Sequence, residues 1–208
     1  MQIQRYVLGA YATNCYRVAN EETHTCVLVD PADHGEELVK RLEQDGLTPE
    51  AILLTHGHYD HILGVPALQK RWPALPVYCH PLDCPEELEE RDMGQVFPTV
   101  SAFANLKPLA DEQTLDLVGT QFRVLHTPGH TPGSVCFLLG QFMFSGDTLF
   151  YRSIGRTDFA GGNMAQMNNS LRRLAQLPGN FRVLPGHDMD TMLDDERREN
   201  PYMRGMTL

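Results

Sequence analysis

A short stretch of the chain, Thr55–His61 (THGHYDH), combines the side chains that most often bind metal ions in proteins. Three of the nine histidines in the chain and one aspartate, Asp60, fall within it. Neutral imidazole is the commonest metal ligand, and a carboxylate adds negative charge that offsets a divalent cation. The competing interpretation is a solvated polar loop, but so dense a gathering of histidines favours metal. The sequence therefore predicts a metal site in this loop.

Three further stretches share the character of this loop. Each follows an apolar segment and includes glycine, which allows the backbone to turn sharply so that a histidine or aspartate projects from the end of a strand. Taken singly, each is a weak signal, whereas the four together make a strong one. The three stretches are HTPGHTPGS at 126–134, FSGDTLF at 144–150 and LPGHD at 184–188.

The elements expected to position these stretches are predicted from hydrophobic periodicity and turn residues. The apolar run before the first histidine loop indicates a buried strand, and a similar run at 25–29 indicates a strand covered on both faces. Strands are predicted at 3–8, 14–18, 25–29, 51–54, 76–79, 114–117, 121–126, 134–139, 141–145 and 181–184. Helices are predicted at 34–45, 62–72, 83–91, 163–177 with Asn163 as N-cap, and 194–200, and a loop or lid at 93–108.

This order of elements predicts an α/β fold, a four-layer αββα sandwich of two mixed sheets flanked by helices. A length of 208 residues and a hydrophobic content of 42% suit one domain spanning residues 1–208, with a sizeable core.

Together, the motifs THGHYDH, TPGHTPGS, SGDTLF and PGHD resemble the metallo-β-lactamase superfamily, and more narrowly a short form of its glyoxalase II-like, hydroxyacylglutathione hydrolase-type branch. The motifs follow the family's order from residue 55 to residue 188, so the resemblance covers nearly the whole chain. It implies two metal sites that share one carboxylate. The first site would comprise His56, His58 and His130, the second Asp60, His61 and His187, and Asp147 would bridge them.

The resemblance implies a binuclear metal-dependent hydrolase of thioesters such as S-acylglutathione. Two divalent ions at roughly 3.5–4 Å would share a hydroxide that attacks the thioester carbonyl. Asp60 and Asp147 are the expected catalytic carboxylates, since they would hold the metals and orient the water. Zinc is the first expectation, but histidine and aspartate also bind iron and manganese.

For residues near the motifs, the expected roles are less specific. Arg152 and Arg156 are the best candidates to meet an anionic substrate, although an ion pair with Asp158 explains Arg156 equally well. Asp30 is expected to brace the histidine loop. Among the others, His126 is expected to support a ligand from outside or to be structural, Tyr59 to be a packing residue, and Asp188 to be either a support for His187 or a surface cap.

Three alternatives remain open at this stage. Longer hydroxyacylglutathione hydrolases that this chain resembles have a helical C-terminal segment that helps bind glutathione, whereas this sequence stops at Leu208, so a lactone or another ester is also expected as a substrate. A mononuclear non-haem iron oxygenase resembling the persulfide dioxygenases would share these motifs. A metal-stabilised binding protein is disfavoured, because structural sites rarely need two metals.

The amino-acid composition disfavours some classes of partner. The net charge of −10 and the lack of a long Lys/Arg cluster disfavour nucleic acid as a partner. The sequence contains no apolar run of about 18 residues, so no transmembrane helix is expected. The N-terminus lacks the pattern of a signal peptide, which points to the cytoplasm. The five cysteines, Cys15, Cys26, Cys79, Cys84 and Cys136, include no C-x-x-C pair and are expected to be buried and reduced, with zinc binding by Cys79, His80 and Cys84 as a minor alternative. The sequence does not give the oligomeric state.

Overall fold

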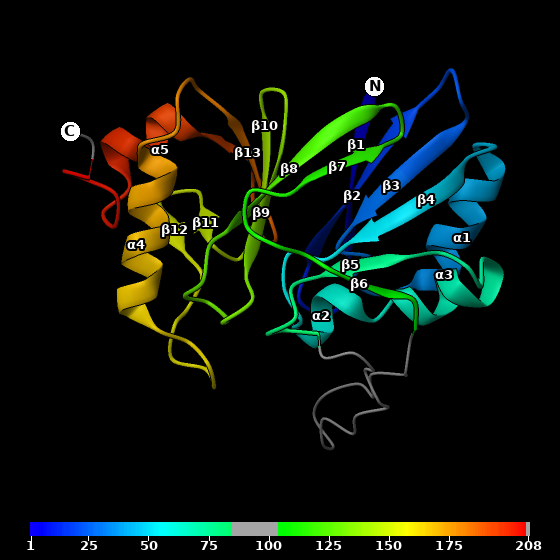
Figure 1. Cartoon of the computed structure of the whole chain (residues 1–208), viewed down its shortest axis with the longest axis horizontal. Coiled ribbons are helices and arrows are strands. Elements are labelled where there is room, and N and C mark those ends of the chain that lie inside the picture. Colours follow the sequence, from blue (N-terminus) through cyan, green and yellow to red (C-terminus); the bar gives the residue numbers. More distant parts are fainter. Residues whose placement is uncertain (85–103, 207–208) are drawn as a thin grey trace.

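The computed structural model describes residues 1–84 and 104–206, and these form two six-stranded sheets packed face to face with helices outside them (Figure 1). The first sheet has the strand order β1-β2-β3-β4-β5-β6. Its strands are β1 (Gln2–Leu8), β2 (Thr13–Asn20), β3 (Thr25–Val29), β4 (Thr48–Leu53), β5 (Val77–Cys79) and β6 (Leu106–Pro108). The pairs β1–β2 and β2–β3 are antiparallel, whereas β3–β4, β4–β5 and β5–β6 are parallel, so the sheet is mixed.

The second sheet has the order β14-β13-β10-β9-β8-β7. Its strands are β7 (Thr114–Leu117), β8 (Thr120–His126), β9 (Val135–Leu139), β10 (Phe142–Gly146), β13 (Arg182–Pro185) and β14 (Thr191–Met192). The pair β10–β13 is parallel and the other pairs are antiparallel. A separate ribbon pairs β11 (Leu149–Phe150) with β12 (Ser153–Ile154).

Alternation along the central strands divides the core into three layers. On β3, Cys26 and Leu28 face the helices outside the first sheet, whereas Val27 and Val29 face the second sheet. On β9, Phe137 packs between the sheets while its neighbours Cys136 and Leu138 pack against the outer helices of the second sheet. Because both faces are covered, these strands read as unbroken apolar runs. The predicted αββα sandwich is confirmed.

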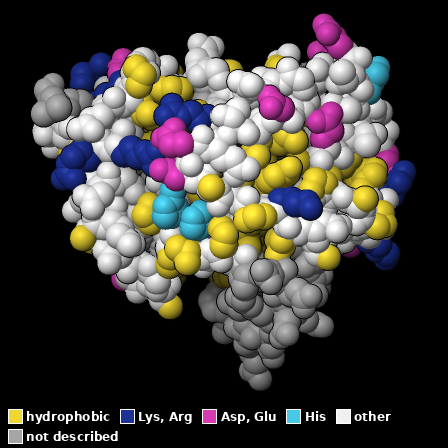
Figure 2. Space-filling model, in the orientation of Figure 1, with side chains coloured by type: hydrophobic (Ala, Val, Ile, Leu, Met, Phe, Trp, Pro, Cys, Tyr) yellow, Lys and Arg dark blue, Asp and Glu magenta, His cyan; other side chains and the backbone are white. Residues whose placement is uncertain are grey.

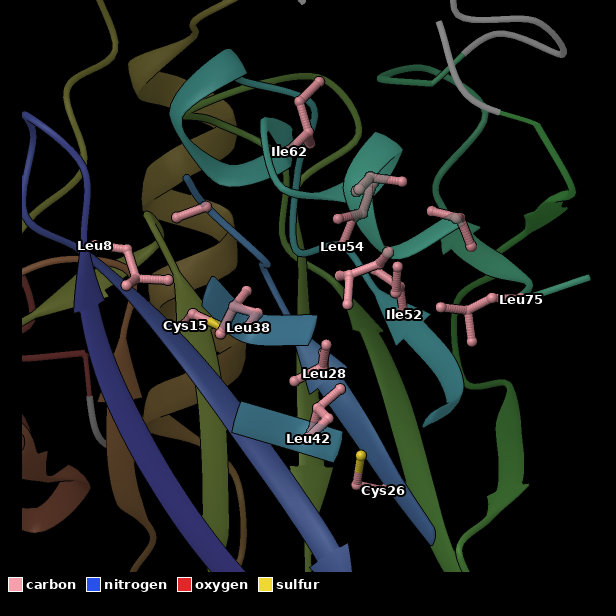
Figure 3. Close-up of a cluster of buried hydrophobic side chains, with 14 of the residues drawn as sticks. Leu8, Cys15, Cys26, Leu28, Leu38, Leu42, Ile52, Leu54, Ile62 and Leu75 are labelled. Carbon is pink, nitrogen blue, oxygen red and sulfur yellow. The ribbon is translucent and has the colours of Figure 1, made fainter. Parts of the chain in front are cut away.

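Amphipathic helices cover the two outer faces. Helix α1 (Gly35–Gln44) places Leu38 and Leu42 against Leu28 of β3 (Figure 3), and α3 (Val65–Arg71) packs beside it. On the other side, α4 (Met164–Ala175) and α5 (Leu193–Glu199) cover the second sheet. Asn163 caps α4 as predicted, since its side chain accepts a hydrogen bond from the backbone N–H of Gln166.

Some predicted elements are wrong in detail. The single helix expected at 62–72 is two helices, a short α2 (Tyr59–Ile62) and α3, because the chain turns at Gly64, whose N–H donates to Pro31 and Ala32 carbonyls. The expected loop at 93–108 ends as strand β6, which pairs with β5. The predicted helix at 83–91 and residues 93–103 lie outside the described residues, apart from Asp83 and Cys84.

The prediction that all cysteines are reduced is wrong for one pair. Cys79, at the end of β5, forms a disulfide with Cys84. The pair therefore does not offer two thiolates for zinc. Cys15, Cys26 and Cys136 are free and buried as expected, and burial raises the pKa of Cys136 to about 11.

One face of the molecule shows how the charged side chains are distributed. On the face drawn in Figure 2, basic side chains are scattered among acidic and hydrophobic ones. Within residues 1–84 and 104–206, no helix has the length and apolar character needed to cross a membrane.

The inter-sheet layer is expected to dominate stability. Phe137 is fully buried there, and Phe137→Ala should lower the free energy of unfolding by about 3–5 kcal/mol because it removes apolar contacts and leaves a cavity. Urea denaturation measures the change. Val7→Ala, at a side chain that is 57% exposed, is the control and should change it by less than about 0.5 kcal/mol. Similar losses in both variants would contradict this view of the core.

Candidate metal centre

The seven histidine and aspartate residues predicted as ligands all follow the carboxyl ends of strands. His56 and His58 follow β4, and Asp60 and His61 lie in the adjoining helix α2. The other three come from the second sheet: His130 follows β8, Asp147 follows β10 and His187 follows β13. Ligand sites in open α/β sheets form at such ends. The fold thus brings together residues that are far apart in the sequence.

The first group consists of His56, His58 and His130. One ring nitrogen from each lies within 4.8 Å of the others, a spacing that can hold a metal ion. The closest approach is 2.9 Å, between His58 Nδ1 and His130 Nε2. Three imidazoles from the loops of two sheets therefore lie close enough together to bind one ion.

The second group consists of Asp60, His61 and His187, whose ligand atoms also lie within 4.8 Å of one another. Asp60 Oδ2 is 3.3 Å from His187 Nε2 and 3.6 Å from His61 Nε2. This group has a carboxylate and two imidazoles, so it carries more negative charge than the first.

The Asp147 carboxylate lies between the two groups. Its Oδ2 is 3.4 Å from His130 Nε2 and 3.5 Å from His187 Nε2, while its Oδ1 is 3.5 Å from His61 Nε2. The space for it depends on Gly186, where an added Cβ would lie 2.2 Å from Asp147 Oδ1. The Asp147 carboxylate therefore lies next to ring nitrogens of both groups.

Several buried polar atoms at this centre have no hydrogen-bond partner. They are His56 Nε2, His61 Nε2 and Asp147 Oδ1. Leaving such atoms unsatisfied costs about 1–3 kcal/mol each, so native proteins rarely do so without a reason. All three belong to the two groups described above, and all three can donate an electron pair to a cation. The residues present therefore fit a metal ion.

Hydrogen bonds on the other ring nitrogens orient the imidazoles. Asp30 Oδ2 lies 3.0 Å from His61 Nδ1, the Arg156 carbonyl 2.7 Å from His130 Nδ1, and the Tyr11 carbonyl 3.1 Å from His187 Nδ1. These contacts leave Nε2 of each ring facing the cluster, the arrangement in which an outer acceptor fixes the tautomer of a ligating histidine.

Asp30 braces the histidine loop, as predicted. Beyond its contact with His61, it accepts hydrogen bonds from the backbone N–H of Thr55 at 2.8 Å and from the Thr55 hydroxyl at 2.7 Å. Asp30 also lies close enough to His56 and His61 to form a third group with metal-ligand spacing. Because both its oxygens already accept from these donors, we assign it to orientation rather than to metal binding.

The pKa values differ between the groups. Burial and the neighbouring charges of His130 and His61 lower the pKa of His58 to about 4, and burial likewise lowers that of His56. These rings are neutral at pH 7 and can donate a lone pair. Although burial opposes it, the charges of Asp147 and Asp30 raise the pKa of His61 to about 9. The carboxylates thus favour a positive charge in the second group, and a bound cation would replace that proton.

The two predicted arginines are placed differently from the ligands. Arg152 donates to the Asp195 carbonyl at 2.7 Å and lies over the Tyr151 ring, towards α5. Arg156 pairs with Asp158 at 2.7 Å through two hydrogen bonds, and its guanidinium lies 3.8 Å from the centre of the Phe159 ring. Phe159 in turn contacts the His58 ring edge-on, so Arg156 is adjacent to the centre.

Three other residues singled out by the motifs have structural contacts. The His126 ring stacks on His80 at 4.3 Å and its Nε2 lies 2.9 Å from the Pro132 carbonyl. Tyr59 packs edge-on against Tyr11. The backbone carbonyl of Asp188 accepts from Asn14, so this residue contributes its main chain next to His187.

Sequence reasoning missed two residues that contact the centre. Thr13, at the start of β2, donates a 2.9 Å hydrogen bond to Asp60 Oδ2. Asp83 accepts hydrogen bonds from the loops that carry the first group. Both are remote in sequence from the residues that they contact, and neither lies in a motif, so no local pattern indicates them.

Comparison with known proteins identifies the family of the chain. The family model of the metallo-beta-lactamase superfamily matches residues 8–187. The chain belongs to this superfamily. Among solved structures, the B3 metallo-beta-lactamase BLEG-1 is similar, with a TM-score of 0.87 and 35% identity over 98% of this chain and 100% of that one. TTHA1623, solved in a di-iron-bound form, has a TM-score of 0.81 and 41% identity over 96% and 99% of the two chains.

Two relatives of this superfamily member are named as hydrolases. The probable metallo-hydrolase YqgX of Bacillus subtilis is 32% identical over 100% of both chains. The hydroxyacylglutathione hydrolase GloC of Haemophilus influenzae is 32% identical over 98% of both chains. The expected resemblance to a glyoxalase II-like hydrolase is confirmed at this level.

The role of Asp30 gives a test of the centre. Asp30→Asn should lower metal affinity about 10- to 100-fold. Both oxygens of Asp30 accept hydrogen bonds from Thr55 or His61, whereas an amide has only one oxygen that can accept. Competition with a chromophoric zinc chelator measures the affinity. Glu36→Gln, the same change at an exposed position of α1, should leave affinity unchanged. Wild-type affinity in Asp30→Asn would contradict the assignment.

Proposed function

We propose that this protein is a binuclear metal-dependent hydrolase of thioesters such as S-acylglutathione. The observation that carries the proposal is the Asp147 carboxylate, which faces both groups of ligands while one of its buried oxygens lacks a hydrogen-bond partner. A carboxylate so placed is suited to two cations. The proposed ligands are His56, His58 and His130 for one ion and Asp60, His61 and His187 for the other, with Asp147 shared.

When bound, two divalent ions supply Lewis acidity and a water that ionises near neutral pH. The residues of the chain hold and orient that chemistry. Asp60 is fixed by Thr13 and His187, which, against the effect of burial, keep its pKa well below the usual range. It is therefore a carboxylate at neutral pH, and with Asp147 it would provide the negative charge that two cations require.

The surroundings of the centre favour an acyl substrate. Aromatic rings lie beside the histidines: Phe159 contacts His58, and Phe150 contacts His187 at 6.1 Å between ring centres. Such rings offer apolar contact to an acyl chain. Similarity to GloC supports a glutathione thioester in particular.

Arg156 is the candidate to meet the carboxylates of such a substrate. It is more than half exposed, and its exposed ion pair with Asp158 is the kind that contributes little stability, so a substrate carboxylate can compete for the guanidinium. Arg152 remains a second candidate, although its side chain is directed to α5. Zinc is the proposed metal, and iron is supported by the di-iron form of TTHA1623.

Removing the shared carboxylate charge tests the catalytic assignment. Asp147→Asn keeps the size of the side chain but should reduce bound metal below that of the wild type and lower kcat/KM for an S-acylglutathione by about 100-fold or more. Elemental analysis and a thiol-release assay on the same sample measure both. Asp116→Asn, at an exposed position of β7, is the control and should match the wild type. Reduced metal with undiminished hydrolysis would reject the proposal.

The reaction products distinguish thioester hydrolysis from the alternative activities. For the wild type, we expect thiol release from acyl thioesters without oxygen uptake. Oxygen consumption on a persulfide by an iron-loaded protein, with no thioester hydrolysis, would instead indicate an oxygenase. Faster turnover of a lactone or oxygen ester than of every thioester tested would leave the hydrolase but reject the thioester as substrate.

A further inference from the structure

Asp83 connects the two loops that carry the first group of histidines. Its Oδ2 accepts a hydrogen bond from the backbone N–H of Gly57 at 3.1 Å, between His56 and His58. The same oxygen accepts from the Thr131 hydroxyl at 2.5 Å, and Oδ1 accepts from the backbone N–H of Gly133 at 2.6 Å. Thr131 follows His130 directly, so one carboxylate bonds to both loops.

Close packing shows that this position is specific. An added Cβ on Gly57 would lie 2.6 Å from the Asp83 carbonyl oxygen, and one on Gly133 would lie 2.5 Å from Asp83 Oδ1. Any residue other than glycine at position 57 or 133 would therefore prevent the loops from approaching Asp83 this closely. The glycines of the two histidine motifs do more than permit turns, since they make room for this aspartate.

The disulfide fixes the segment that presents Asp83. Cys79 belongs to β5, which pairs with β4 and β6, and the disulfide to Cys84 closes a short ring that includes Asp83. Within the ring, the backbone N–H groups of Asp83 and Cys84 both donate to the His80 carbonyl. The aspartate is thus tied to the carboxyl end of β5 by a covalent bond and by a turn.

We propose that Asp83 is a positioning residue that holds the His56–His58 loop and the His130 loop at the spacing needed for a shared metal ion, and that the Cys79–Cys84 disulfide holds Asp83 in place. The loops come from different sheets, which the hydrogen bond from the Val135 N–H to the Thr55 carbonyl already joins beside His56. Asp83 adds a side-chain link between the loops themselves. A carboxylate that accepts from both loops sets their separation and does not itself bind the metal. This role involves no substrate and is independent of the proposed thioester chemistry.

Zinc affinity of the intact protein tests the role of Asp83. Asp83→Asn leaves one acceptor oxygen, so its NH2 group faces the backbone N–H of either Gly57 or Gly133. We therefore expect at least one zinc-binding step to weaken about tenfold or more in chelator competition. Thr131→Val removes only one of the three hydrogen bonds to Asp83, together with the contact between the Thr131 and Ser134 hydroxyls, and should give a smaller loss. In the cobalt-substituted protein, the visible absorption of Asp83→Asn should differ from that of the wild type, because the three imidazoles change their relative positions.

Asp111→Asn is the matched control. The Asp111 carboxylate accepts from the backbone N–H of His126 at the start of the same loop and from Arg173, but it does not join the two loops. It should lower thermal stability while leaving zinc affinity within twofold of the wild type. Zinc affinity within twofold of the wild type in Asp83→Asn, or an equal loss in Asp111→Asn, would overturn the proposal.

A double variant, Cys79→Ala with Cys84→Ala, tests the disulfide. We expect a loss of zinc affinity similar to that of Thr131→Val, with the fold retained by circular dichroism. Wild-type affinity in the double variant would reject the role of the disulfide. Since these measurements use zinc and cobalt alone, a failure here is distinct from a failure to hydrolyse thioesters.

Discussion

The centre depends on one constraint: a single buried carboxylate, that of Asp147, must lie within 3.5 Å of ring nitrogens from both groups of ligands. This is met because β10 and β13 run parallel at the middle of the second sheet, so that Asp147 and His187 leave the sheet side by side. Gly186 provides the room in which the Asp147 carboxylate sits. The loop after β4 brings the remaining negative charge, Asp60, to the same place.

The sandwich gives the ligands a rigid base. Strand β4, buried on both faces at 51–53, ends close to the centre, and the fully buried β9 begins there. Val135 at the start of β9 donates its N–H to the Thr55 carbonyl. This bond joins the two sheets directly beside His56. Around it, Asp30, Thr13 and Asp83 fix the side chains and loops that bear the ligands. Sites held in this way lose little entropy on binding a metal and keep their geometry.

Much of this arrangement can be predicted from the sequence, for identifiable reasons. The unbroken apolar run at β3 predicts a strand covered on both faces, and the structure covers it with α1 and the second sheet. The histidine motifs follow strands, so their convergence follows from the fold that they imply. The helix predicted at 62–72 is wrong because periodicity does not register the turn at Gly64.

Contacts between distant residues are what the sequence could not provide. Thr13 reaches Asp60 because β2 lies close to β4 in the first sheet, and Asp83 reaches Gly133 because the two sheets are stacked. Neither residue differs locally from any other turn or strand residue. The Cys79–Cys84 disulfide escaped prediction because a lone pair of cysteines with this spacing matches no framework pattern.

The central claim, two metal positions that share Asp147, is tested most directly by anomalous diffraction from crystals of the zinc-loaded protein. The account predicts two anomalous peaks. One should lie among His56, His58 and His130 and the other among Asp60, His61 and His187, with Asp147 in contact with both. A single peak, or a peak coordinated by Asp30 with His56 and His61, would contradict it.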